Sequence, residues 1–193
     1  MIGKSLKIAI RFTLITTLLL GIVYPFLVTG FAQLALRRQA NGGLITRDGA
    51  VVGSQLIGQK FTSEKYFHSR PSVAGNGYDA SNSSGSNYAQ SNQKLLTRIQ
   101  GDVAKASTDN PTQLVPIDLV TASGSGLDPD ITPAAALYQV HRIAEVRKLT
   151  DDEVTKLVNA HITPRQFGLL GEPRVNVLEL NLALDGLSRA GRH

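Results

Sequence analysis

Apolar residues are concentrated in one stretch near the amino terminus. Residues 12–36 read FTLITTLLLGIVYPFLVTGFAQLAL and contain no charged residue. A helix rises about 1.5 Å per residue, so about 20 apolar residues are enough to cross the hydrocarbon core of a membrane. The pattern therefore predicts one transmembrane helix over 12–36, preceded by a short basic segment at 1–11 and followed by one soluble domain at 39–193.

Two other structures compete with a retained membrane anchor. A cleaved signal peptide would use the small residues around Phe31 for cleavage before Gln33. However, the apolar stretch is longer than the roughly 7–15 residues of a signal peptide, and arginines follow it closely. A helix buried in a soluble core would carry a polar or charged face, and this stretch has none. The pattern favours the anchor.

The middle of the predicted span offers contacts for a second helix. Pro25 follows Tyr24 there and removes one backbone donor, and Gly21 lies one turn earlier. Small residues let a neighbouring helix approach closely, which makes Gly21, Tyr24 and Pro25 candidate partner-helix contacts. A lone anchor that binds no other helix is the alternative.

The remaining pattern mixes the periods of strands and helices. Asp48-Gly49 is a typical hairpin turn, Thr132 precedes Pro133 as a helix start, and Thr150 with Glu153 forms a capping box. Strands are expected at 44–46, 51–52, 55–58, 115–121 and 174–175, and helices at 92–106, 132–148, 150–161 and from about 176. The fold class is therefore a single amino-terminal transmembrane α-helix followed by one α+β soluble domain.

Residues 72–93 form a long stretch of Gly, Ser and Asn without helix or strand period. A disordered linker is the default interpretation of such a composition. Because loops of this length inside compact domains are usually functional, we favour an ordered functional loop.

The charge distribution argues against nucleic acid as a partner. The formal net charge is +5, from 20 Lys and Arg against 15 Asp and Glu. Five of the basic residues flank the span, and the other 15 balance the acids of the soluble domain. Lys4, Lys7 and Arg11 precede the span, against Arg37 and Arg38 after it, which favours a cytoplasmic amino terminus and an exported domain.

No self-sufficient catalytic or metal-binding set is recognisable. The four histidines lack metal-ligand spacing, there is no cysteine, and no Gly-Lys-Ser or Gly-Lys-Thr phosphate loop occurs. Asp128 and Asp130 lie before a helix without the spacing of a calcium loop or its closing glutamate. The residues indicate a membrane-anchored binding or assembly module.

Several stretches together resemble a known family. They are Gly21–Pro25, 39–45, 53–59, 66–72, 84–87, 120–128, 131–133 and 175–185. The order of these stretches and the share of the chain that they cover resemble the C subunit of the Kdp-type potassium-transporting P-type ATPase. The resemblance extends over nearly the whole chain.

The resemblance implies a single-pass subunit of the cell inner membrane. Its partners would be a channel-like potassium-binding subunit, a P-type ATPase subunit and a small accessory peptide, and potassium would be handled by those partners. The chain would be non-catalytic, stabilise the complex, and act as a catalytic chaperone that raises the affinity of the pump subunit for ATP in a ternary complex. The residue linked to that role falls on Gln139, for which a polar side chain facing solvent or a partner is the plainer interpretation.

An exported domain cannot touch cytoplasmic ATP, so an effect on nucleotide affinity would be transmitted through the membrane partners. We expect the 72–93 loop, with Ser84, Gly85 and Asn87, and the aspartates Asp128 and Asp130 to face the channel-like subunit. The alternative function is a membrane-anchored exported binding module unrelated to a pump.

Overall fold

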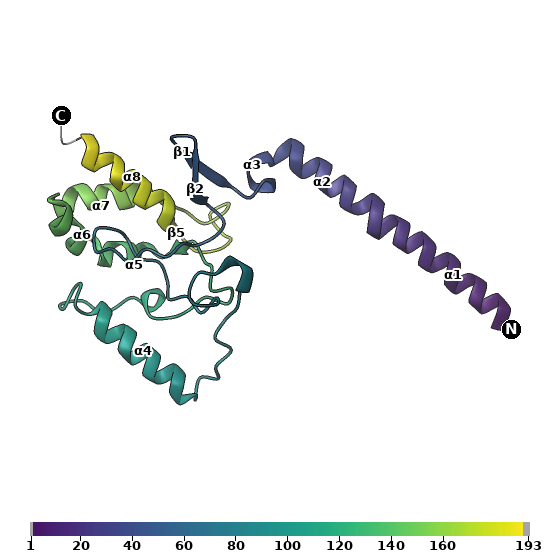
Figure 1. Ribbon diagram of the computed structural model, residues 1–193, viewed down its shortest axis with the longest axis horizontal. Helices are drawn as coiled ribbons and strands as arrows, with labels where there is room; N and C mark the ends of the chain where they lie inside the picture. Colours follow the sequence, from purple (N-terminus) through teal and green to yellow (C-terminus); the bar gives the residue numbers. More distant parts are fainter. Residues whose placement is uncertain (1, 191–193) are drawn as a thin grey trace. The chain divides into compact units, whose positions relative to one another are not determined.

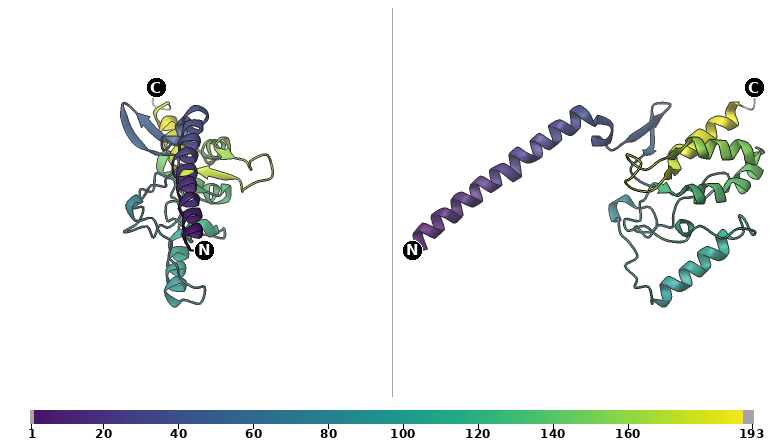
Figure 2. Two further views of the ribbon diagram at one scale, coloured as in Figure 1. Left: turned by 90° about the vertical axis from the view of Figure 1, so that its right-hand side faces the viewer. Right: turned by 180° about the vertical axis from the view of Figure 1, so that it is seen from behind.

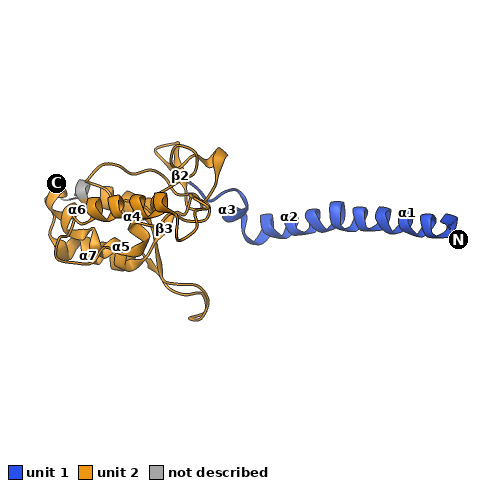
Figure 3. Ribbon diagram, turned by 90° about the horizontal axis from the view of Figure 1, so that it is seen from below, with its two compact units in different colours: residues 1–44 blue, residues 45–193 orange. Residues whose placement is uncertain are grey.

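The computed structural model describes residues 2–190 and divides into two compact units after Leu44 (Figure 3). The first unit is helical, and the second contains helices with two small sheets. This organisation confirms the predicted fold class of a long apolar helix followed by an α+β region.

The amino-terminal unit is one continuous helical rod. It comprises α1 (Ile2–Leu18), a π-helical turn η1 (Leu19–Val23) and α2 (Tyr24–Ala35), followed by the short helix α3 (Arg37–Ala40). Every leucine, isoleucine, valine, phenylalanine and tyrosine side chain from Ile2 to Leu36 is exposed. The helix over Ile2–Ala35 is long and apolar enough to cross a membrane. It begins ten residues before the predicted span.

The π-helical turn accommodates Pro25. Proline has no backbone N–H and its ring crowds the preceding turn, so an uninterrupted α-helix would be strained there. In the structure the N–H of Tyr24 donates to the carbonyl of Leu19, five residues earlier, and Pro25 lies in the first turn of α2. The wider turn places Gly21, Tyr24 and Pro25 within one local irregularity of the rod.

The second unit contains the remaining elements, most of which are labelled in Figure 1. A two-stranded hairpin comes first, and a three-stranded antiparallel sheet of order β3-β5-β4 lies among the helices. The elements are β1 (Leu44–Arg47), β2 (Ala50–Ser54), η2 (Ala80–Asn82), α4 (Gln93–Ala106), η3 (Ile117–Leu119), β3 (Asp130–Ile131), α5 (Pro133–Tyr138), α6 (Val140–Arg147), α7 (Asp151–Ala160), β4 (Ile162–Thr163), β5 (Arg174–Asn176) and α8 (Val177–Ala190). In the sheet, Val175 pairs with both Ile131 and Ile162.

The hydrophobic core lies between helices α5 to α8 and the small sheet. Its fully buried members include Ile143, Val154, Val158, Leu180 and Leu184. These positions recur at helical spacing, which is why the apolar pattern of the sequence located α7 and α8 correctly. Burial of such side chains is the main stabilising contribution to the unit.

Helix α4 stands outside this core, as Figures 1 and 2 show. None of its residues is buried. Its carboxyl end is fixed because the hydroxyl of Tyr138 donates to the carbonyls of Ala106 and Asn110, at 3.1 Å each. Tyr138 is itself 2% exposed, so this contact ties the end of α4 to the core.

Several local predictions are confirmed by cap and turn geometry. Asp48 and Gly49 both have positive φ in the turn between β1 and β2, as a tight hairpin of this kind requires. The hydroxyl of Thr132 accepts from the N–H of Ala135 at the start of α5. Thr150 and Glu153 form both halves of a capping box at the start of α7.

Two predicted strands are wrong. Residues 55–58 form a turn with an isolated bridge between Ser54 and Ile57. Residues 115–121 contain the 3₁₀ turn η3, which buries Asp118 and exposes Ile117. The reason is tertiary, because the Asp118 carboxylate accepts from both the N–H and the hydroxyl of Thr132, at 2.7 and 3.1 Å.

The helix predicted over 132–148 is interrupted at Gln139. The N–H of Gln139 bonds to the carbonyl of Ala136, three residues back, and separates α5 from α6. The helix pair ends as predicted at Lys148, which adopts the left-handed conformation of a helix carboxyl end. The interruption coincides with a buried polar side chain, that of Gln139 itself.

Candidate functional site

An irregular segment, residues 64–68, runs through the second unit and is held by side chains instead of strands. Phe67 within it is fully buried and belongs to the core cluster. Buried backbone N–H and C=O groups must find hydrogen-bond partners, and this segment has no neighbouring strand to supply them. Helices α6 and α8, together with Gln139, supply them with polar side chains.

Two buried amide side chains form hydrogen bonds with the backbone of consecutive residues in this segment. Asn181 of α8 accepts from the N–H of Phe67 at 2.8 Å and donates to its carbonyl at 3.0 Å. Gln139 accepts from the N–H of His68 at 2.8 Å and donates to its carbonyl at 3.2 Å. Both amides are at most 2% exposed. We call Asn181 and Gln139 the amide clamp.

Two arginines of α6 complete the support. Arg142 donates to the carbonyls of Glu64 and Tyr66 and to the side-chain oxygen of Gln139, the last at 2.9 Å. It also pairs with the carboxylate of Asp109 at 2.7 Å, in the loop after α4. Arg147 donates to the carbonyl of Lys65 at 2.8 Å. The segment is therefore fixed by four side chains from α6, α8 and the α5–α6 junction.

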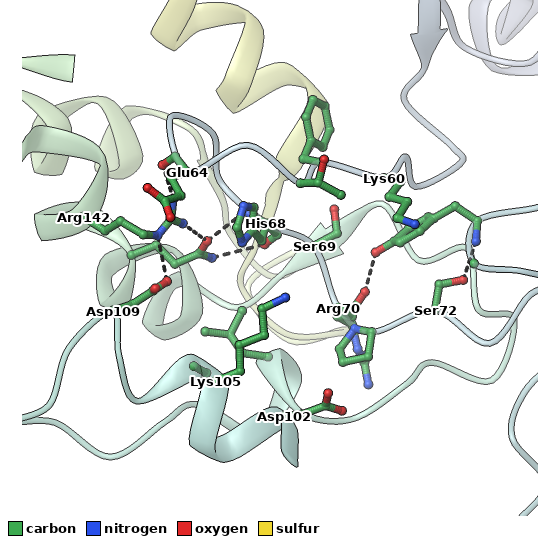
Figure 4. A pocket seen from close by; sticks show the side chains of 18 of the residues that line it. Lys60, Glu64, His68, Ser69, Arg70, Ser72, Asp102, Lys105, Asp109 and Arg142 are labelled. Carbon is green, nitrogen blue, oxygen red and sulfur yellow. Dashed lines mark hydrogen bonds and ion pairs between the residues drawn. The ribbon is translucent and has the colours of Figure 1, made fainter. Parts of the chain in front are cut away.

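A pocket of about 510 Å³ lies beside the amide clamp (Figure 4). Four basic residues line it: Lys60, Arg70, Lys105 and Arg142. Arg142 pairs with Asp109, and Arg70 pairs with Asp128 at 3.0 Å. Within residues 2–190 no ion pair joins Lys60 or Lys105 to an acid. The acids Glu64, Asp102 and Asp109 line it as well, so the four basic residues exceed the acids of the lining by one formal charge.

His68 lines the same pocket, and its environment disfavours the protonated ring. Burial is the main cause, and the positive charge of Arg142 adds to it, so the pKa of His68 lies below its ordinary value of 6.5. Its Nε2 atom lies 3.1 Å from the carbonyl of Ser63. The ring is therefore held neutral at pH 7.

We expect the free energy of unfolding to fall as pH drops below about 6.5, because the unfolded chain then binds a proton at His68 that the folded chain binds less readily. Replacing His68 with Gln removes this contribution and should flatten the pH dependence between about 7 and 5. Urea unfolding of the full chain at several pH values measures it. The same slope in both proteins would contradict the assignment.

The structure places the predicted site residues in three locations. Gln139 is 1% exposed, so the expectation that its side chain faces solvent or a partner is wrong. Ser84 and Gly85 pack against the 123–128 loop: the N–H of Ser84 donates to the carbonyl of Ser125 at 3.0 Å, and Gly85 lies against Gly124. Asn87, three residues further, has a positive φ of 53°.

The contact between these two loops depends on glycine. Gly126 has a φ of 67°, and a Cβ there would lie 2.7 Å from the carbonyl oxygen of Ser84 and 2.8 Å from the N atom of Ala74. The hydroxyl of Ser72 donates to the carbonyl of Gly126 at 2.6 Å. Part of the 72–93 stretch is therefore packed backbone-to-backbone against its neighbour, which differs from the arrangement expected of a linker.

The two candidate aspartates already have partners within the unit. Asp128 pairs with Arg70, and its other carboxylate oxygen accepts from the N–H of Asp130. Asp130 pairs with Arg174 at 3.1 Å and accepts from Asn176 at 3.2 Å. Burial raises the pKa of Asp130 above its ordinary value. Among residues 2–190, no group of three His, Cys, Asp or Glu side chains could hold a metal ion.

Sequence reasoning missed Asn181, Arg142, Lys60 and Lys105. Asn181 lies on an otherwise apolar helix, between leucines that are buried in the core. A polar residue at such a position indicates a buried hydrogen-bonding group, so the sequence did contain a signal for it. Arg142 gave no signal, because an arginine on an amphipathic helix normally faces solvent. The lysines are ordinary surface residues by pattern and are brought together only by the fold.

The buried polar groups of the site are directed at the chain's own backbone, and the unit that contains them follows a helix long and apolar enough to cross a membrane. A family model described as "K+-transporting ATPase, c chain" (KdpC) matches residues 6–186. The chain belongs to this family.

Several relatives are similar to the chain over nearly its whole length. The chain is 57% identical over 182 residues to the "Potassium-transporting ATPase KdpC subunit" of Acidobacterium capsulatum, with 94% of this chain and 98% of that one covered. It is 51% identical over 183 residues to the subunit of the same name from Koribacter versatilis, covering 95% of each. Against that of Gemmatimonas aurantiaca it is 57% identical over 187 residues, covering 96% and 94%.

Proposed function

We propose that this chain is a non-catalytic accessory subunit of a high-affinity, ATP-driven potassium uptake complex, whose assembly it stabilises. The observation that carries the proposal is the family match over residues 6–186, supported by relatives at 51% and 57% identity that are named as subunits of such an ATPase. Its partners are a channel-like potassium-binding subunit, a P-type ATPase subunit and a small accessory peptide.

The subunit is anchored in the cell inner membrane by its retained amino-terminal helix, with the second unit exported. The exposure of every large apolar side chain in that helix supports a lipid or partner-helix environment. The basic residues before the span support a cytoplasmic amino terminus. Gly21, Tyr24 and Pro25, at the π-helical turn, contact a neighbouring helix of the complex.

The subunit raises the affinity of the pump subunit for ATP indirectly. Gln139, the residue linked to this effect, is enclosed in the second unit and uses its amide to hold His68. A contact between Gln139 and nucleotide would first have to break those bonds. The effect is therefore a coupling through membrane partners, with a free energy of about 1–3 kcal/mol.

Direct binding of ATP to this chain, which requires the second unit to lie on the cytoplasmic side, is a second candidate, favoured by one observation. Lys60 and Lys105 line the pocket beside Gln139, and no ion pair among the described residues joins either lysine to the acids Glu64 and Asp102 of the same lining, which leaves both ammonium groups available to phosphate. Photoaffinity labelling of the purified complex with an azido-ATP separates the candidates. Labelling of this chain that is lost in Lys105→Met supports direct binding, and labelling confined to the pump subunit supports coupling.

Asp128 and Asp130, with the 72–93 loop, lie on the face that meets the channel-like subunit. Replacing both aspartates with Asn should weaken the apparent potassium affinity of uptake several-fold, because it removes the pairs of Asp128 with Arg70 and of Asp130 with Arg174 that shape the proposed contact face. Potassium uptake at low external concentration measures this. Asp152→Asn, which alters an exposed pair with Lys156, is the matched control.

The aspartate variant must be tested for folding, since it removes the pairs with Arg70 and Arg174. Partly exposed pairs contribute at most about 1 kcal/mol, so the unit should remain folded. An unchanged apparent potassium affinity in the folded variant would refute this placement of the face.

Copurification tests the proposed function itself. In mild detergent, the tagged full chain should be recovered with a potassium-stimulated ATPase activity. A stand-alone exported binding module would be recovered without other subunits. Protease protection of the second unit in intact cells and its digestion in spheroplasts would establish the exported orientation.

A further inference from the structure

The loop between β4 and β5 carries the most exposed cluster of large apolar side chains in the described part of the second unit. Phe167 is 92% exposed, Leu169 79% and Leu170 60%. We call these three residues the apolar tip. In Figure 2 the loop that carries them, yellow-green, extends away from the body of its own unit. Exposed apolar clusters of this kind normally mark interaction surfaces.

The tip is a rigid hairpin with its own hydrogen bonds. Gln166 and Leu170 exchange two backbone bonds at 2.9 Å, and the N–H groups of Gly168 and Leu169 donate to carbonyls within the loop. At its base, Arg165 pairs with Glu172 at 2.5 Å, and Thr163 pairs with Arg174 in the sheet. Four N–H groups around the tip are thus satisfied internally, which lowers the cost of removing the tip from water.

The backbone conformation favours a fixed protein socket over a fluid lipid surface. Phe167 has a φ of 53°, a left-handed conformation that is uncommon for an aromatic residue. It is followed by Gly168 at 74°, and Gly171 has a φ of 76°. Lipid insertion requires apolar area but no single geometry, whereas anchors that enter a pocket bind best when held in advance in one conformation.

The chain itself limits where such a socket can be. The membrane-spanning helix ends at Ala35 and the second unit begins at Ile45. Of residues 36–44, four are helical at about 1.5 Å each and five can extend to about 3.6 Å each, so Ile45 lies within about 24 Å of the end of the span. The proteins within that range are those that surround the span.

We propose that the apolar tip is an anchor that inserts into an apolar socket on the extramembrane surface of a neighbouring subunit of the same ATPase. The inference rests on the proposed function and adds to it the surface used. Phe167 is the central anchor, with Leu169 and Leu170 beside it, in the manner of the few side chains that dominate protein interfaces. Because three side chains cover less than a standard interface, the tip fixes position and adds to contacts made elsewhere.

Photocrosslinking in the purified complex tests the anchor. The full chain carrying Phe167→p-benzoylphenylalanine should form an adduct with another subunit, identified by mass spectrometry, about tenfold or more above background. Leu114→p-benzoylphenylalanine is the matched control, since Leu114 is 95% exposed in the loop after α4. Both positions are exposed, so neither variant disturbs the core.

Each outcome bears on the anchor alone. An adduct between Phe167 and another subunit, exceeding that of Leu114, supports it. Adducts only with lipid, or a yield no greater than that of Leu114, overturn it. Copurification of the unlabelled complex is measured in the same preparation, so a missing adduct in an assembled complex rejects the anchor without rejecting the proposed function.

Discussion

Replacing Gln139 with Met is expected to lower the free energy of unfolding by about 3–5 kcal/mol. Methionine fills a similar volume but leaves the N–H and carbonyl of His68 and one N–H group of Arg142 without their partner. Each buried polar group that is left without a partner costs about 1–3 kcal/mol, because it has given up its hydrogen bonds to water and forms none in the folded protein. Chemical denaturation of the full chain in detergent, monitored by intrinsic tyrosine fluorescence, measures the change.

The matched control is Gln100→Met on an exposed position of α4. It should change the free energy of unfolding by no more than about 0.5 kcal/mol, since surface substitutions away from special features rarely do more. If Gln139→Met lowers the free energy of unfolding no more than Gln100→Met does, the amide clamp does not hold the 64–68 segment.

Replacing Arg142 with Met should destabilise the second unit by a similar amount, about 3–5 kcal/mol. The substitution leaves the Asp109 carboxylate without its ion pair and strands the carbonyls of Glu64 and Tyr66. It also releases the loop after α4, whose attachment to the core depends on Arg142 and Tyr138. The same unfolding measurement applies, with limited proteolysis at residues 107–116 as a second readout.

A double-mutant cycle separates the ion pair from the backbone contacts. Asp109→Asn combined with Arg142→Met should cost less than the sum of the two single substitutions, because the double variant has no unpaired carboxylate. Additive costs would mean that the pair between Arg142 and Asp109 does not contribute to stability.

Local features of the fold could be predicted from the sequence because their causes are local. Asp48-Gly49, Thr132 with Pro133, and Thr150 with Glu153 each specify a turn or helix start through neighbouring residues. The apolar periods of α7 and α8 likewise report which side faces the core. The π-helical turn before Pro25 also follows from one local cause, the missing N–H group.

The predictions that were wrong for residues 115–121 and for Gln139 share a different cause. In both places a polar side chain is buried, and its hydrogen-bond partner is distant in the sequence. Asp118 reverses the apolar alternation of 115–121 because its carboxylate is needed at Thr132, a contact fourteen residues away. Gln139 was expected at a surface because glutamine is usually exposed, yet its partner His68 lies 71 positions earlier. No pattern within a window of the sequence contains such pairs, so the candidate site could be located only in part.

Under the proposed function, the amide clamp gives a physical account of how Gln139 would act on the pump from a buried position. Gln139 and Asn181 hold adjacent residues, Phe67 and His68, from two different helices. Any change in nucleotide affinity that depends on Gln139 would then depend on the position of this segment and on what it presents to the partners. Asn181 should therefore influence the pump in the same way, although it does not line the pocket.

The Michaelis constant for ATP of the purified complex, compared between Gln139→Met and Asn181→Leu, tests this account most directly. Leucine has the branched shape of asparagine, so the second substitution also removes the hydrogen bonds while keeping the side chain's outline. The account predicts that both assembled complexes show a raised Michaelis constant, by similar factors of about five or more. A raised value for Gln139→Met together with an unaltered value for Asn181→Leu would contradict it and point to direct contact between Gln139 and nucleotide.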